Sequence, residues 1–236
     1  MRVSESRKRL DQLYRRVVRN GLVGTLRRHG FRKEAGDYLH FVGQEVVCAV
    51  RPVRPPLWAK PGEVRFTTSC AVFVTAIEQL FPEGKGPTYH ADSTISQIRP
   101  QVAEISGEDK GSSWCIREDA SEDALSALER AISRVFEVHV LPWFGQFQTA
   151  KAVADYLASP EVGPGRIRLG YREIPQDARD LRNAAIAYFG AGEYKRAREM
   201  LDLAARTIDP ATHLTVDLRE RMERLIAQRQ KKRFKS

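Results

Sequence analysis

A segment rich in proline and glycine, Ser159–Gly165, divides the chain into two parts of different character. Four of its seven residues are proline or glycine, the residue types that most often mark turns and linkers. Helical and extended patterns alternate before this segment, whereas the pattern after it is helical almost throughout. We therefore predict an α+β domain over 1–158, a linker over 159–166, a helical segment over 167–228 and a basic tail over 229–236.

The first part begins with a predicted helix over 4–29. Leu10, Leu13 and Val17 recur at helical spacing on one face. Gly21 and Gly24 weaken the helical propensity, so we expect either a bend there or a partner element packed closely against the glycines. Gly30 is the expected left-handed residue that ends the helix.

Short extended segments follow this helix. We predict a hairpin of strands over 38–42 and 45–51, pairing that ends in the proline-rich stretch 51–58, and a central strand over 64–77. Further strands are expected over 95–105 and 113–117. A helix capped by Ser121 is expected to end before Pro142, and another covers 149–158. This order predicts an antiparallel β-meander flanked by helices.

Three amphipathic helices are predicted after the linker, over 180–189, 194–208 and 213–230. The first two resemble a single tetratricopeptide repeat at the positions Ala185, Tyr188, Gly192, Tyr194, Ala197, Leu201 and Ala204. A lone repeat cannot bury its own apolar face, so we expect this helical hairpin to pack either on the first domain or on a partner.

The first part also contains three short motifs in a fixed order. The sequence Leu26-Arg-Arg-His-Gly-Phe-Arg-Lys33, the sequence Tyr38-Leu-His-Phe41 and the later Leu141-Pro-Trp-Phe144 stand in this order within residues 4–158. In this respect the chain resembles the bacterial domain-of-unknown-function family 4304. The resemblance implies no catalytic residues, and it implies an immunity or accessory role because some members occur beside polymorphic toxin systems.

The positive charge of the chain is concentrated at its two ends. Residues 1–36 hold eleven Lys and Arg against three Asp and Glu, and residues 229–236 hold five basic residues. A nucleic-acid-binding protein that uses both ends is therefore an alternative hypothesis. Its candidate residues are Arg9, Arg16, Arg19, Lys231, Lys232 and Arg233.

Several residue classes argue against chemistry at a metal or cofactor. The chain has three cysteines, an odd number: Cys48, Cys70 and Cys115. They lie in apolar or β-like stretches, so we expect reduced, buried thiols. His90 and Asp92 offer two neighbouring ligands, which leaves a metal-dependent hydrolase as a second alternative. We otherwise predict no catalytic set, no metal and no cofactor.

The leading hypothesis is a non-enzymatic protein-interaction module. Arginine and tryptophan are enriched at interface hot spots, and the candidates near the proline-rich loop and the sheet are Arg51, Arg54, Trp58, Arg99 and Trp114. No stretch approaches the roughly 18 apolar residues of a membrane span, and a signal-peptide core is missing. We expect a cytoplasmic protein with a protein partner and without a membrane partner. Homo-oligomerisation stays open.

Overall fold

The computed structural model describes residues 2–54, 60–81, 89, 91, 96–107, 113–159, 178–207 and 213–233. In chain order the elements are α1 (Arg2–Val17), the π-helical segment η1 (Val18–Val23), α2 (Gly24–Arg28), β1 (Arg32–Glu34), β2 (Asp37–Val42), β3 (Val46–Val53), β4 (Glu63–Val74), α3 (Ala76–Leu80), α4 (Val102–Ser106), β5 (Trp114–Arg117), α5 (Glu122–Val135), the π-helical segment η3 (Phe136–Val140), α6 (Leu141–Phe144), α7 (Ala150–Ala158), α8 (Ala178–Gly190), α9 (Tyr194–Thr207) and α10 (His213–Arg233). The α+β prediction is confirmed.

The sheet is an antiparallel meander. Its five strands stand in the order β1-β2-β3-β4-β5, so each strand pairs with its neighbour in the chain. Gly43 has a φ of 59° between β2 and β3, a conformation that glycine adopts at little cost. The predicted hairpin at this position is therefore confirmed.

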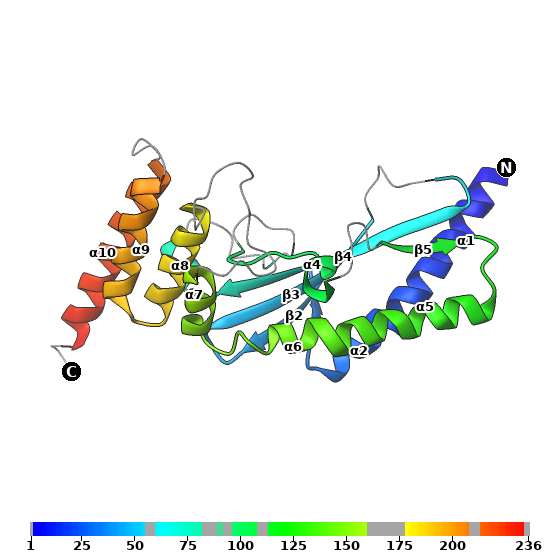
Figure 1. The fold of residues 1–236 in the computed structure, drawn as a ribbon, viewed down its shortest axis with the longest axis horizontal. Coiled ribbons are helices and arrows are strands. Elements are labelled where there is room, and N and C mark those ends of the chain that lie inside the picture. Colours follow the sequence, from blue (N-terminus) through cyan, green and yellow to red (C-terminus); the bar gives the residue numbers. More distant parts are fainter. Residues whose placement is uncertain are drawn as a thin grey trace.

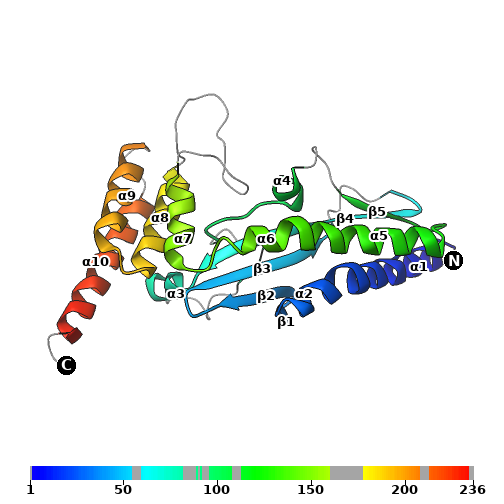
Figure 2. The same ribbon diagram turned by 60° about the horizontal axis from the view of Figure 1, so that its bottom comes forward.

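Two long helices cover one face of the sheet. The first runs through α1, η1 and α2, and the second runs through α5, η3 and α6; Figure 2 shows them side by side. They approach most closely at Gly21, where an added Cβ would lie 2.9 Å from the carbonyl oxygen of Glu129. Of the two expectations for the glycines, close packing of a partner element is confirmed at Gly21.

The hydrophobic core lies between these helices and the sheet. Its largest fully buried side chains include Leu22, Leu26, Phe66 and Phe136. The same cluster continues into the C-terminal helices, where Phe189 is fully buried. A smaller cluster on the opposite face of the sheet consists of Leu39, Val47, Ala49, Ala71, Phe73, Tyr89 and Ala91.

The C-terminal helices dock on the rest of the protein. Each of α7, α8, α9 and α10 packs on the next, and the stack occupies the end of the molecule opposite the N-terminus (Figure 1). An added Cβ at Gly190 would lie 2.9 Å from Cγ1 of Val74 on β4. Asn183 of α8 donates a hydrogen bond to the carbonyl oxygen of Gln97 at 3.0 Å. Of the two alternatives for this segment, the structure shows packing on its own chain.

The strand predicted over 95–105 is wrong. Residues 96–101 contact β4 through two isolated bridges, and the helix α4 follows. Pro100 has no N–H with which to extend a ladder. Backbone hydrogen bonds join Ile98 to Val72, and at the end of β4 the side chain of Gln97 accepts a hydrogen bond from the backbone N–H of Val74 at 2.6 Å in place of a backbone partner.

Proline ends fewer elements than the sequence predicts. The helix expected to stop before Pro142 continues through η3 into α6, and Pro142 lies in the first turn of α6, directly after the π-helical segment. Pro52 lies inside β3, opposite Thr68 of β4. It is tolerated because the pairing of β3 with β2 has ended by this point, which leaves β3 paired on one side.

The central strand is also shorter than predicted. β4 ends at Val74, and Ile77 belongs to the short helix α3. The linker expected over 159–166 lies, beyond Ser159, outside the described residues.

Candidate functional site

The arginines predicted to bind a protein partner lie on opposite sides of the sheet. Arg51 Nε lies 3.5 Å from the buried carboxylate of Asp37. Arg54 lies on the helix side, where its guanidinium lies 2.7 Å from Asp11 of α1 and 4.7 Å from the centre of the Tyr14 ring. Both arginines hold elements of the fold together, and they do not form one surface.

The aromatic candidates are likewise structural where the structure describes them. Trp114 is half-buried on β5, with its ring centre 5.3 Å from that of Phe66 and 6.5 Å from that of Phe136. Arg99 is half-buried in the segment that precedes α4. Trp58 lies outside the described residues.

Some cations of the first helix face the second helix and others do not. Arg16 and Arg28 turn toward the second helix. Arg16 lies 2.7 Å from Glu122 and 3.1 Å from Glu129, and Arg28 lies 2.7 Å from Glu137. The hydrogen bond that Arg16 donates to Glu122, together with the charges of Glu122 and Glu129, raises the pKa of Arg16. These cations are therefore neutralised within the protein.

The remaining nucleic-acid candidates are spread over the molecule. Arg19 is exposed on η1, and Arg9 lines a shallow pocket of about 710 Å³ together with Arg117 and Glu118. Lys231 is exposed near the end of α10, which also contains Lys232 and Arg233. Figure 1 places α1 and the C-terminus at opposite ends of the molecule. The two basic ends therefore do not form one contiguous surface, because the helical stack extends away from the first helix.

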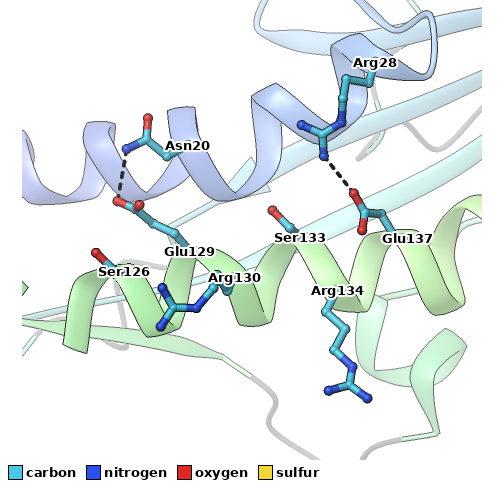
Figure 3. Close-up of a pocket in the computed structure, with 8 residues that line it drawn as sticks. All are labelled: Asn20, Arg28, Ser126, Glu129, Arg130, Ser133, Arg134 and Glu137. Atoms are coloured by element: carbon cyan, nitrogen blue, oxygen red, sulfur yellow. Dashed lines mark hydrogen bonds and ion pairs between the residues drawn. The ribbon is translucent and has the colours of Figure 1, made fainter. Parts of the chain in front are cut away.

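A polar groove of about 500 Å³ lies between the two long helices (Figure 3). Its lining residues are Asn20, Arg28, Ser126, Glu129, Arg130, Ser133, Arg134 and Glu137. Both carboxylates have partners across the groove: Asn20 donates to Glu129 at 3.2 Å, and Arg28 donates to Glu137 at 2.7 Å. One hydrogen bond and one ion pair therefore join the two helices across the groove.

The π-helical segments η1 and η3 both border this groove, and the sequence reasoning missed them. Asn20 belongs to η1 and Glu137 to η3. The hydroxyl of Ser133 donates to the carbonyl oxygen of Gly21 at 2.7 Å, which joins the two helices at their closest approach. The pair of glycines was the available signal for η1, since Gly21 lies within it and Gly24 directly follows it, whereas η3 contains no glycine.

Two of the three cysteine side chains are buried as predicted, and one is exposed. Cys48 and Cys70 are buried as predicted, and burial raises the pKa of Cys48 to about 12 and raises the pKa of Cys70. Cys115 is exposed at the sheet edge, so the prediction that it is buried is wrong. Burial and the acceptor Glu63 raise the pKa of Cys115 as well, so none of the three is an activated thiolate.

Metal ligands do not gather in the part of the chain that the structure describes, where no three His, Cys, Asp or Glu side chains could hold an ion. His90 and Asp92 of the hydrolase hypothesis lie outside it. Within the same residues, no helix is both long and apolar enough to cross a lipid bilayer.

The C-terminal stack α7–α10 carries exposed apolar side chains, and the sequence did not predict a binding surface there. Leu203 of α9 is 41% exposed and Val216 of α10 is 53% exposed. Arg198 and Glu223, whose charged groups lie 2.6 Å apart, and the ion pair of Asp202 with Arg219 fix the antiparallel register of these helices. Leu203 and Val216 therefore lie toward the same end of the α9–α10 pair.

Comparisons with known protein families, with curated proteins and with solved structures find no match to this chain. The resemblances to family 4304 and to a tetratricopeptide repeat stay predictions from the sequence motifs.

Proposed function

We propose that this protein is a non-enzymatic interaction module that recognises another protein through its C-terminal helices. The supporting architecture is the stack α7–α10, in which consecutive helices pack on one another. Stacked helical hairpins are widely used as scaffolds for protein binding. An immunity or accessory role is the form of this proposal that the family resemblance favours.

The observation that carries the proposal is the exposed apolar pair Leu203 and Val216, which we call the apolar pair. Both residues lie within about one turn of the ion pair of Asp202 with Arg219 along their helices, since Leu203 follows Asp202 and Val216 precedes Arg219 by three residues. Apolar anchors bordered by charged groups are the usual composition of a protein interface. The buried stripe Leu218, Met222 and Ile226 already holds α10 in place, so the apolar pair is not needed for packing.

The test uses two matched substitutions in the full chain. Val216→Asp places a charge in the apolar pair, whereas Val138→Asp places it on η3 at a side chain that is 54% exposed. Partner protein recovered by affinity capture is quantified for wild type and both variants, and circular dichroism checks that each variant is folded. We expect Val216→Asp to reduce recovery by about tenfold or more and Val138→Asp to leave it unchanged. Equal recovery with the two variants would overturn the proposal.

A further inference from the structure

The outward face of the first helix carries three cations in one line. Lys8, Arg15 and Arg19 are all exposed, and Gln12 lies between the first two. The spacing from residue 8 to 12, 15 and 19 keeps these positions on one side of a helix. We call Lys8, Arg15 and Arg19 the basic stripe.

The basic stripe differs from the neighbouring cations in its lack of counter-charges. Arg16 and Arg28 face the second helix and pair with its glutamates, and Arg54 pairs with Asp11. No ion pair joins a member of the basic stripe to an acidic side chain in the described part of the chain. Asp11 lies one turn from both Lys8 and Arg15 along the helix, but its ion pair is with Arg54; Glu5 lies one turn before Lys8. The fold thus neutralises its inward arginines and leaves these outward cations to solvent.

Such a line of cations repels itself when nothing binds it. Arg15 and Arg19 stand four residues apart, a spacing at which like charges destabilise a helix. A polyanion would remove this repulsion and release its own condensed counterions. From Lys8 to Arg19 the helix rises about 16 Å, which is about five phosphate spacings along one strand of a duplex.

We infer that the basic stripe binds the phosphate backbone of double-helical nucleic acid without reading its bases. The aromatic residue of this helix segment, Tyr14, is half-buried beneath Arg54 and so is not placed to stack on an unpaired base. This surface lies at the opposite end of the molecule from the apolar pair. The inference is therefore independent of the proposed function.

The experiment compares two triple variants of the full chain. The first is Lys8→Gln, Arg15→Gln, Arg19→Gln. The matched control is Lys195→Gln, Arg206→Gln, Arg224→Gln, which removes the same charge from exposed positions of α9 and α10. Glutamine has a helix propensity close to those of lysine and arginine, so both variants are expected to fold. Circular dichroism verifies this.

Binding to a short fluorescent DNA duplex of scrambled sequence is followed by anisotropy between about 50 mM and about 200 mM salt. We expect wild type and control to bind with a steep salt dependence. We expect the stripe variant to bind at least about tenfold more weakly at the lower salt, with a log–log salt slope shallower by about 2.7.

Three outcomes would overturn the inference. The first is absence of wild-type binding at the lower salt, and the second is an equal loss in both variants, which would mean that net charge alone matters. The third is competition by polyglutamate as effective as that by unlabelled duplex, which would assign the stripe to an acidic protein instead.

Discussion

The closest contact between the two long helices predicts opposite effects for two neighbouring glycine-to-alanine substitutions. At Gly21 an added Cβ would lie 2.9 Å from the carbonyl oxygen of Glu129, 3.1 Å from its Cα and 3.2 Å from Cβ of Ile132. Backbone atoms cannot turn aside as the end of a flexible side chain can, so the helices must separate. At Gly24 the nearest atoms, from Arg19 and Arg28, would be 3.8 Å away, which is an ordinary contact.

The magnitudes follow from two opposing effects. Alanine gains up to about 1 kcal/mol over glycine in helix propensity, and overpacking a core contact costs about 1–3 kcal/mol. We therefore expect Gly21→Ala to lower the free energy of unfolding by about 1–2 kcal/mol and Gly24→Ala to raise it by about 0.5–1 kcal/mol. Urea denaturation followed by circular dichroism measures both values. A Gly21→Ala variant as stable as wild type would refute the close approach of the helices.

Three further predictions address other parts of the molecule. In Gly190→Ala the new Cβ would lie 2.9 Å from Cγ1 of Val74, so we expect the free energy of unfolding to fall by about 1–3 kcal/mol. Proteolysis of the C-terminal helices should also become faster. Unchanged stability would contradict the docking of these helices on the sheet. In the folded protein a disulfide reagent should modify Cys115 first, and the reaction should become faster as the pH rises toward the raised pKa of this thiol. In urea all three thiols should react. Modification of all three at one rate without urea would contradict the burial of Cys48 and Cys70. Arg198 lowers the pKa of Glu223, so their pair stabilises the fold above the ordinary carboxyl pKa and ceases to do so as the pH falls through the lowered value. Glu223→Gln should accordingly cost less than about 1 kcal/mol at neutral pH and nothing in acid, as measured by thermal unfolding at both pH values.

The elements with strong local signals were predictable from the sequence. The Ser121 side chain accepts a hydrogen bond from the N–H of Ala124 at 3.2 Å, as its place before two acidic residues indicates. Gly30 has a φ of 81° and ends the first helix. Both features depend on residues within one turn, so the sequence shows them directly.

Features that depend on distant residues could not be predicted. The π-helical segment η1 contains Gly21, and the backbone that lies against Gly21 is that of Glu129, more than 100 residues later in the chain. The ion pairs of the candidate arginines could not be predicted for the same reason. Arg54, for example, pairs with Asp11, which lies 43 residues earlier in the chain. Composition indicated which residues are suited to an interface, but tertiary pairing decides which of them stay free.

The central claim is that the end of the α9–α10 pair contacts a protein partner. Its most direct test is site-specific photo-crosslinking in extracts of the source cells, with the photoreactive residue at position 216 in one preparation and at position 138 in the other. The account predicts one protein of defined mass crosslinked from position 216 and not from position 138. The same set of crosslinks from both positions, or none from position 216, would contradict it.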